Sequence, residues 1–557
     1  MTDVSDATPS NGTAPAQSTS PQADIQVDMF EVQLGSAILL QFKQVAGRPV
    51  RVLADGGVRA SGYQVTHVLN KLQTAFNDFG QSERYLDLVV GTHYDADHLC
   101  GLVPIIQDKD IEIGEAWMPP VANDSGESPS DVEVGEADLL GQQMMEAYQE
   151  NADRGLTSSH VLDDYLESKA SICQSCESLE AQLVEGGEEL TRERSQSYEW
   201  TAGMSREQKL AYFKAHLQAA AAAMGERESC HANDPQLDGD QISSMQERIL
   251  NARHDFYYWH GNKSRIEEYL SDYLRFVGLG MSLSSAQYNL AGIRKGAASD
   301  AINATSLDAV VGALVKRGIP IRFEAITAGE PKRFIWDAIN RRFQKNASGK
   351  GALKITLLGP STTLIKKHRD RLPIAIYQAF ALMQVMRIKS ITPSNQLSYV
   401  LKFQTKANSI LVTGDAGLVD AKKPPKTGKG YYFRKILDEL SSLDVVQVAH
   451  HAGSSAHFYR VLIHADIANQ KRQLNLLLSH ETHDKHRPST EFDNFVSIVR
   501  GDHDNLRILF TSEPEKQKVL HFVDLIGICV SKHAKVGDIQ MQLVCGSWCL
   551  KKHAIKV

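Results

Sequence analysis

The chain has 557 residues, of which 42% are hydrophobic and 23% are charged. This balance is typical of a water-soluble chain with a folded core, and the length exceeds that of one ordinary domain. Seven cysteines are too few for a disulfide scaffold, and no apolar stretch reaches the length of a membrane span. We therefore exclude a membrane channel, a secreted mini-protein and a wholly disordered chain. Since no secretion signal opens the sequence, we expect a cytoplasmic protein without a membrane partner.

The net charge of −7 conceals two oppositely charged regions. By their counts of Asp, Glu, Lys and Arg, residues 121–300 carry roughly −16 and residues 301–557 carry roughly +17. Basic surface attracts partners that carry phosphate groups, although a charged face that only contacts water would give the same counts.

The first part of the chain contains a polar segment followed by strand and helix patterns. Residues 1–24 have almost no large apolar side chain, so they cannot bury enough surface to offset the entropy of ordering, and we predict a disordered tail. The apolar spacing then predicts a hairpin of two strands, 30–34 and 38–42, joined by a tight glycine turn. A third strand at 49–54, a helix at 63–79 and a buried strand at 85–90 are predicted to follow.

From residue 125 to residue 300 the strand-like runs disappear, and Ala, Glu, Gln, Ser and Leu dominate. Helix formers at this density predict a helical insertion. Strand-like runs resume after it, at 319–323, 353–359, 398–403, 409–413, 445–448, 474–478 and 506–510. The predicted organisation is one folded unit in two parts, split by an acidic helical insertion and followed by a β extension: 25–124, 125–300, 301–515 and 516–557.

The densest group of chemically active residues directly follows the buried strand at 85–90. It has the pattern His93-x-Asp95-x-Asp97-His98. Imidazole suits zinc, iron and manganese, and carboxylates extend the range toward manganese and magnesium. A helix cap would explain one of the aspartates but not two His and two Asp, so the pattern predicts a metal site.

This motif after an apolar strand resembles the metallo-β-lactamase-fold hydrolases, and most closely the branch that includes the C-terminal hydrolase domain of ComEC-type competence proteins. Further segments resemble motifs of that branch in the expected order, namely Phe30 to Ala37, Asp55-Gly56-Gly57, Ala328-Gly329-Glu330, Leu358-Gly359-Pro360, Asn395 to Leu401, Thr413-Gly414-Asp415-Ala416, His450 to Ser454 and His486 to Ser489. The resemblance covers about 29–120 and 305–515. It implies an α/β fold, a metallo-β-lactamase-type αβ/βα four-layer sandwich with a large helical insertion.

The resemblance also implies two divalent metal ions, Zn2+ or Mn2+, and their ligands. It assigns His93 and Asp95 to one ion, Asp97, His98 and His450 to the other, and Asp415 to a bridging position. An aspartate that caps a helix would also fit the sequence around Asp415.

Two histidines stand next to each other after the strand at 445–448, and their side chains point to opposite sides of an extended backbone. We expect one of them to be a metal ligand and favour His450, with His451 as a substrate contact. Ser454 is expected to contact the substrate as well. The resemblance gives His486 a catalytic role beside Asp97, as a phosphate contact or proton donor.

The expected activity is metal-dependent hydrolysis by a metal-activated hydroxide. A loop over 422–435 combines lysines with aromatic rings, and we expect Lys426 and Lys429 to bind a nucleic-acid backbone, although a solvated loop would have the same composition. A phosphodiesterase or nuclease acting on DNA or RNA is therefore favoured. The alternatives are a hydrolase of an acyl, lactone or peptide bond, and a subunit with latent activity whose insertion binds a protein partner.

Overall fold

The computed structural model describes the chain over residues 23–33, 35–45, 47–57, 65–80, 82–119, 170, 305–345, 353–369, 393–423, 431–453, 455–470, 472–479, 481, 484, 487–501, 506–512 and 537–552. The predicted tail over 1–24 and the predicted insertion over 125–300 lie outside these ranges, apart from residues 23, 24 and 170. In the described ranges no helix has both the length and the apolar composition that crossing a lipid bilayer requires.

The fold is α/β, with two mixed eight-stranded sheets and several helices. The first sheet runs antiparallel from β16 to β3 and parallel from β3 to β6. Its strands follow one another in the order β16 (Ser547–Lys552), β15 (Ile539–Val544), β1 (Ile25–Met29), β2 (Ile38–Phe42), β3 (Val50–Ala54), β4 (Tyr85–Val90), β5 (Glu112–Met118) and β6 (Ile321–Phe323).

The second sheet is parallel from β14 to β11 and antiparallel from β11 to β8. Its order is β14 (Leu506–Phe510), β13 (Leu474–Leu478), β12 (Val445–Gln447), β11 (Ser409–Val412), β10 (Val400–Gln404), β9 (Lys354–Gly359), β7 (Lys332–Asp337) and β8 (Arg342–Gln344). In both sheets the parallel strands bring their carboxyl ends, and the loops that follow them, to one edge.

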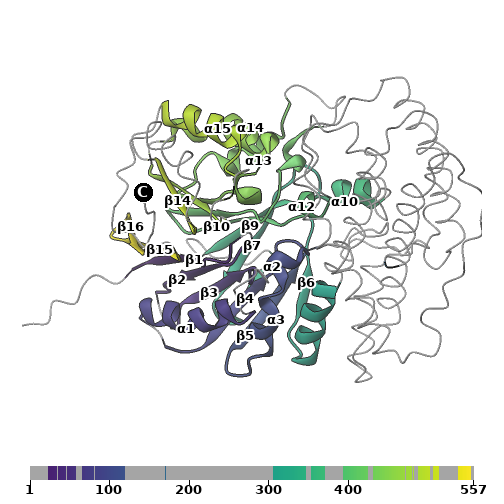
Figure 1. The fold of residues 1–557 in the computed structure, drawn as a ribbon, viewed down its shortest axis with the longest axis vertical. Coiled ribbons are helices and arrows are strands. Elements are labelled where there is room, and N and C mark those ends of the chain that lie inside the picture. Colours follow the sequence, from purple (N-terminus) through teal and green to yellow (C-terminus); the bar gives the residue numbers. More distant parts are fainter. Residues whose placement is uncertain are drawn as a thin grey trace, which may run out of the picture.

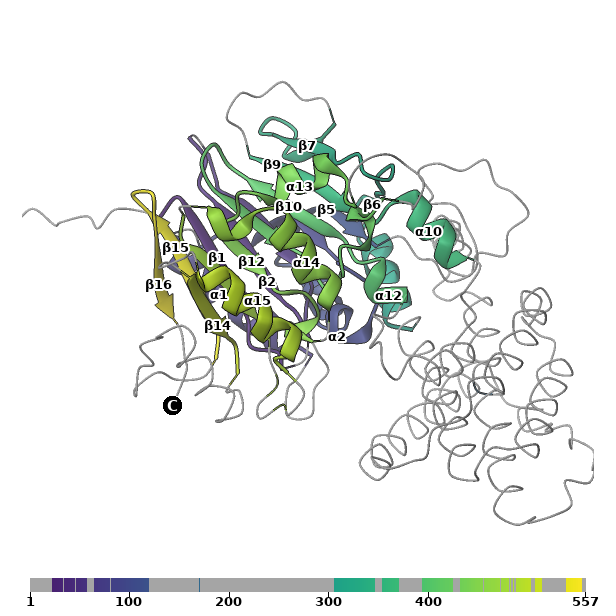
Figure 2. The same cartoon turned by 90° about the horizontal axis from the view of Figure 1, so that it is seen from above.

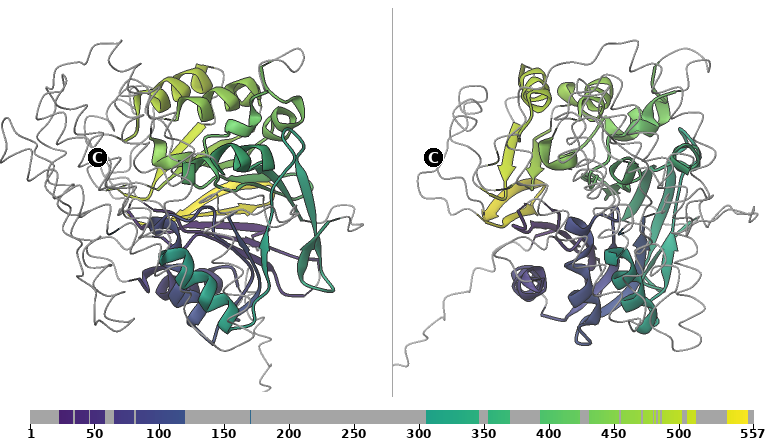
Figure 3. Two further views of the ribbon diagram at one scale, coloured as in Figure 1. Left: turned by 90° about the vertical axis from the view of Figure 1, so that its right-hand side faces the viewer. Right: turned by 45° about the vertical axis from the view of Figure 1, so that its right-hand side comes forward.

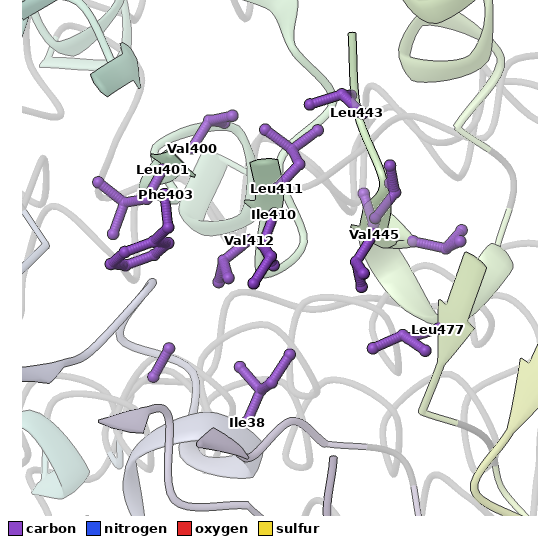
Figure 4. Close-up of a cluster of buried hydrophobic side chains, with 14 of the residues drawn as sticks. Ile38, Val400, Leu401, Phe403, Ile410, Leu411, Val412, Leu443, Val445 and Leu477 are labelled. Atoms are coloured by element: carbon purple, nitrogen blue, oxygen red, sulfur yellow. The ribbon is translucent and has the colours of Figure 1, made fainter. Parts of the chain in front are cut away.

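A single hydrophobic core joins the two sheets, because side chains from both belong to one buried cluster. The Phe42 and Phe403 rings stack with centroids 6.2 Å apart, and Trp117 meets the Phe334 ring edge-on at 4.7 Å. Figure 4 shows the same contact zone, with Ile38 of the first sheet directed toward the Val412 side of the second.

Helices cover the outer sides of the sheets. Figure 1 shows α1 (His67–Asp78) and α3 (Leu102–Gln107) along the first sheet. Figures 1 and 2 show α13 (Arg434–Leu440), α14 (Ala456–His464) and α15 (Thr490–Gly501) along the second. The layering is clear in the side views of Figure 3. The remaining named helices are short or peripheral: α2 (Ala96–Leu99), α10 (Thr362–Arg369), α12 (Pro393–Gln396), η2 (Val419–Ala421), η3 (Ala449–Ala452) and η4 (Ile467–Asn469). Residues 305–316 are also helical.

The predicted hairpin is wrong in its first strand. The strand partner of β2 is β1 (Ile25–Met29) rather than 30–34, and residues 30–37 form the connection, with the Phe30 amide bonded to the Ala37 carbonyl at 2.9 Å. Gln26 and Asp28 made this segment look polar, but both side chains are buried against α1 and β15, where they bond each other at 2.8 Å.

The strands predicted at 38–42, 85–90, 474–478 and 506–510 are confirmed with the same bounds. Strand β5 was not predicted, because Gly114 and Glu115 interrupt its apolar run. Glu115 is nevertheless buried, and its carboxylate pairs with Arg322 at 3.0 Å. Glu115 is therefore a buried charged residue at a position that the apolar pattern alone would predict to be exposed.

An ion pair joins the two sheets at the edge opposite the carboxyl ends of β3 and β4. Arg341 lies in the turn between β7 and β8, and its Nε and Nη2 donate to Asp87 Oδ1 of β4 at 2.9 and 2.6 Å. Burial raises the pKa of Asp87, while the Arg51 amide and Arg341 oppose that shift. Loss of the guanidinium would leave a buried carboxylate without its cation.

We expect Arg341→Ala to lower the free energy of unfolding by about 2–3 kcal/mol, since breaking one side of a buried pair strands the other charge. Urea unfolding in EDTA would measure the change. The neighbouring Arg342 is exposed, so Arg342→Ala should stay within about 0.5 kcal/mol of wild type. Equal losses in the two variants would contradict the assigned role of the Arg341–Asp87 pair.

Candidate metal centre

The candidate metal centre lies where strand ends of both sheets meet. Asp55 follows β3, the segment from His93 to His98 follows β4, Asp415 follows β11, and His450 and His451 follow β12. Because β3 and β4 are parallel, as are β11 and β12, each sheet delivers two of these loops to the same edge.

Possible metal ligands come together in two overlapping groups. His93, Asp97 and His98 form one, and His98, Asp415 and His451 form the other, with the ligand atoms in each group within 4.8 Å of one another. Asp415 Oδ1 lies 3.5 Å from His98 Nε2 and 3.6 Å from His451 Nε2. The second group therefore contains side chains from both sheets.

The carboxylate of Asp55 fixes the proton positions on two of these imidazoles. Asp55 Oδ2 accepts hydrogen bonds from Thr92 Oγ1 and His98 Nδ1, both at 2.7 Å. The Thr92 hydroxyl thereby uses its only proton, so it accepts from His93 Nδ1 at 3.1 Å. Both histidines consequently carry a proton on Nδ1 and present Nε2 toward the cluster.

A second set of hydrogen bonds fixes His451 in the same way. Ser479 follows β13, and its hydroxyl donates to the carbonyl of Gly35 in the loop over residues 30–37. The hydroxyl oxygen can then only accept from His451 Nδ1, which lies 2.9 Å away. His451 Nε2 is left with its lone pair facing Asp415.

Four buried polar atoms in this cluster have no hydrogen-bond partner: His93 Nε2, His98 Nε2, His451 Nε2 and Asp415 Oδ1. Buried polar atoms are rarely left without a partner, and each one costs free energy. Three imidazole nitrogens and a carboxylate oxygen are the ligands that zinc and manganese take in proteins. The residues present therefore fit a divalent metal ion.

The turn that carries the two adjacent histidines is strained. His450, His451 and Ala452 all have left-handed backbones, with φ of 53°, 52° and 60°, which cost of order 1–2 kcal/mol each in residues other than glycine. The amide of Ser489 donates to the Ala452 carbonyl at 2.9 Å, and its hydroxyl donates to the Gly453 carbonyl at 3.0 Å. These bonds hold the turn in place.

Glycines allow the close approaches that the loops need. The Gly56 and Gly101 backbones touch, since a Cβ atom on Gly101 would lie 1.8 Å from the Gly56 carbonyl oxygen. The Gly56 amide also donates to the His98 carbonyl at 2.8 Å. Gly414 has φ +51°, and a Cβ there would lie 2.3 Å from Thr92 Oγ1. The Asp55 turn and the turn before Asp415 are thus packed directly against the histidine loop.

Electrostatics inside the cluster favour positive charge near His98. Burial lowers the pKa of this histidine, but the carboxylates of Asp55 and Asp97 outweigh it and raise the pKa to about 10. Burial raises the pKa of Asp97 to about 7. Burial also acts to raise the pKa of Asp415, but the three surrounding histidines outweigh this effect. The net result is an Asp415 pKa well below its ordinary value.

Burial lowers the pKa of His93 and brings that of His451 to about 3. Both imidazoles are therefore neutral at pH 7, which is the form that binds a metal ion. Protons compete with a metal ion at His98 and Asp97, whose pKa values are raised.

The structure brings most of the predicted ligands together. His93, Asp97, His98 and Asp415 belong to the two groups, and Asp95 Oδ2 lies 3.7 Å from His93 Nε2. The predicted residues His486, Ser454, Lys426 and Lys429 lie outside the described part of the chain.

The geometry favours His451 over His450 as the ligand from this turn. His451 is buried and contributes its Nε2 to the second group. The side chain of His450 is 27% exposed, and its Nδ1 lies 3.0 Å from Asp415 Oδ2 and 2.9 Å from Asn395 Nδ2. The structure therefore favours His451, rather than the expected His450, as the ligand from this left-handed turn, with His451 Nε2 lying 3.6 Å from Asp415 Oδ1.

Sequence reasoning missed four residues that support the centre: Asp55, Thr92, Asn395 and Ser479. Asp55 and Asn395 stand in motifs that the resemblance identified, but neither was assigned a contact. Ser479 directly follows the predicted strand at 474–478, and Thr92 follows the one at 85–90 after Gly91. A hydroxyl at the end of a parallel strand next to a histidine loop is the signal that could have found them.

Comparison with models of protein families finds no match to this chain. A search of curated proteins also finds no match. The chemistry of this centre is therefore inferred from its own residues.

We expect Asp55→Asn to weaken metal binding by about 10- to 100-fold, because it removes the negative charge and an acceptor that orient His93 and His98. Isothermal titration with Mn2+ and Zn2+ would measure this. Asp466→Asn is a matched control, since Asp55 and Asp466 have similar backbone conformations, with φ of 61° and 64°. Wild-type affinity in Asp55→Asn would show that the centre does not depend on this carboxylate.

Metal affinity should rise with pH, because binding displaces protons from Asp97 and His98. With pKa values of about 7 and about 10, both groups are protonated below pH 7 and only His98 above it. The apparent association constant should therefore increase up to about 100-fold per pH unit below pH 7 and about tenfold above. A competition titration with a chromophoric chelator would test this, and a constant affinity from pH 6 to pH 8 would contradict it.

Proposed function

We propose that this chain is a metal-dependent hydrolase with a metallo-β-lactamase-type αβ/βα four-layer sandwich. The observation that carries the proposal is the convergence of three imidazole Nε2 atoms and one carboxylate oxygen, all buried without partners, at strand ends of two facing sheets. The helices outside both sheets and the order of the sequence motifs support the fold assignment.

The ligands can be divided between two ions. The Nε2 atom of an imidazole has one lone pair, so His98 can serve only one ion. His93 and Asp97, with Asp95 nearby, would hold the first ion, and His98, Asp415 and His451 would hold the second. When bound, Zn2+ or Mn2+ supplies Lewis acidity and lowers the pKa of a coordinated water.

Hydrogen bonds from the protein orient the ligand side chains and select one tautomer of each histidine. Asp55 and Ser479 keep the Nδ1 protons in place, so that Nε2 of His93, His98 and His451 remains available as a ligand atom. His450 lies at the solvent side of Asp415 and is held through Nδ1. We propose that this partly exposed imidazole is the proton donor to an oxygen of the substrate.

We propose a phosphodiester of nucleic acid as the substrate. Arg487, whose Nη1 is paired with Asp484 Oδ2 at 3.1 Å, contributes to lowering the pKa of the His451 imidazole. Its guanidinium would also contact a phosphate oxygen bound at the centre. The basic character of residues 301–557 supports the same class of substrate.

The test is cleavage of single- and double-stranded DNA and RNA by purified protein in Mn2+, Mg2+, Zn2+ or EDTA. We expect cleavage that needs a metal ion and falls at least about 10²-fold in Asp97→Ala and His451→Ala, which remove ligands. Asp110→Ala serves as control, since the Asp110 side chain is 80% exposed at the far end of β4 and β5. Stoichiometric metal binding without cleavage of any nucleic acid would overturn the proposed substrate, and absence of metal binding would overturn the hydrolase.

A further inference from the structure

An exposed aromatic ring with cations near it is connected to the metal centre through a short series of contacts. Among the residues that the structure describes, Tyr431 is the only exposed Phe, Trp or Tyr, with 55% of its surface accessible. Lys422, Arg460 and His464 are exposed around it or around its neighbour Tyr432. We call these four residues, Lys422, Tyr431, Arg460 and His464, the Tyr431 surface.

The protein holds the Tyr431 ring in place. The segments 421–423 and 431–433 pair as two short antiparallel pieces, with the Lys423 amide donating to the Tyr431 carbonyl at 3.0 Å and the Phe433 amide to the Ala421 carbonyl at 2.8 Å. Tyr432 is buried and meets the Tyr431 ring edge-on at 4.8 Å. An exposed ring fixed in this way loses little entropy when a planar ligand stacks on it.

The charge on this surface is not neutralised. Within the described residues, neither Lys422 nor Arg460 has a carboxylate within 4.0 Å. Lys422 Nζ lies over the Tyr431 ring, 4.9 Å from its centroid, and Arg460 Nε donates to the Ala456 carbonyl of its own helix. Both cations act electrostatically on the Tyr432 phenol and on the His457 imidazole, where each opposes a positive charge or favours a negative one. The surface therefore presents Lys422 at the Tyr431 ring and Arg460 near the neighbouring Tyr432.

Contacts through Tyr432 and His457 connect the Tyr431 surface to the loop that carries Asp415. His457, one helical turn before Arg460 on α14, donates from Nδ1 to the Gly417 carbonyl at 2.9 Å. Gly417 is two residues from Asp415, a chain distance of at most about 7 Å. A polymer bound across this surface would therefore reach the centre within a few of its repeating units.

We propose that the Tyr431 surface binds single-stranded nucleic acid, with one base stacked on the Tyr431 ring and backbone phosphates paired with Lys422 and Arg460. Every base offers a flat face for stacking, but in a duplex both faces are covered by neighbouring bases, so the ring selects a single strand. Lys422 moves from the ring to a phosphate when the base arrives. The role of this surface in the protein rests on the proposed hydrolysis of nucleic acid, but its binding of nucleic acid can be measured without cleavage.

The experiment measures fluorescence anisotropy of the full-length protein in EDTA with labelled oligo-dT, an abasic strand of the same length, and a duplex. We expect oligo-dT to bind most tightly. Tyr431→Ala should weaken oligo-dT binding about 5- to 100-fold and leave abasic binding within about twofold. Tyr431→Phe keeps the ring and should retain wild-type affinity.

Substitution of the cations should act differently. Lys422→Ala and Arg460→Ala should weaken binding of the oligo-dT strand and of the abasic strand by similar factors. Each should also reduce the magnitude of the slope of log K against log salt concentration by about 0.7. Lys109→Ala removes the same charge from an exposed position in the turn before β5, at the opposite end of the strand from the metal centre, and should change neither quantity.

Two outcomes would overturn the inference: equal binding of dT and abasic strands, or displacement of oligo-dT by polyglutamate at equal charge concentration, which would indicate an acidic protein partner. Cleavage of nucleic acid with unchanged binding in Tyr431→Ala would also overturn it while leaving the proposed function intact. If oligo-dT binding depends on Tyr431 but the protein cleaves no nucleic acid, the binding surface is supported and the proposed nuclease function is overturned.

Discussion

The metal centre depends on one buried carboxylate. Asp55 is fully enclosed and accepts hydrogen bonds from the Thr92 amide, the Thr92 hydroxyl and the His98 ring. A carboxylate in such a place is costly unless donors surround it, so the loop after β4 must adopt one conformation. That conformation determines which nitrogen of each histidine faces the cluster. The chemistry of the site is thus set by a residue that does not belong to either ligand group.

The centre also depends on the packing of the two sheets. The loop over residues 30–37 belongs to the first sheet, yet its Ser36 hydroxyl accepts from Gln447 Nε2 at 2.6 Å. The other end of the same side chain, Gln447 Oε1, accepts from the Thr413 amide at 3.0 Å, just before Asp415. Ser479 connects the same loop to His451. The ligands of the two sheets therefore reach their positions only when the sheets have packed together.

The sequence predicted the parts that depend on local pattern. Buried strands such as 85–90 have continuous apolar runs, and the His/Asp motif after it places four metal-binding side chains in six residues. It could not predict β1 or β5, where buried polar residues find partners from distant segments. It also favoured His450 over His451 as the ligand, because apolar periodicity gives no sign of a left-handed turn. Long-range hydrogen bonds and backbone handedness decided these points.

Strands β5 and β6 are neighbours in the first sheet, with Ala116 paired with Ile321, although about 200 residues separate them in the chain. The intervening segment therefore begins and ends at adjacent points. Closing so long a loop costs only about 2–3 kcal/mol more than closing one of ten residues. In evolution, segments of different length could therefore be inserted between β5 and β6 without displacing the metal-binding residues. During folding, the pairing of β5 with β6 would be among the last contacts to form.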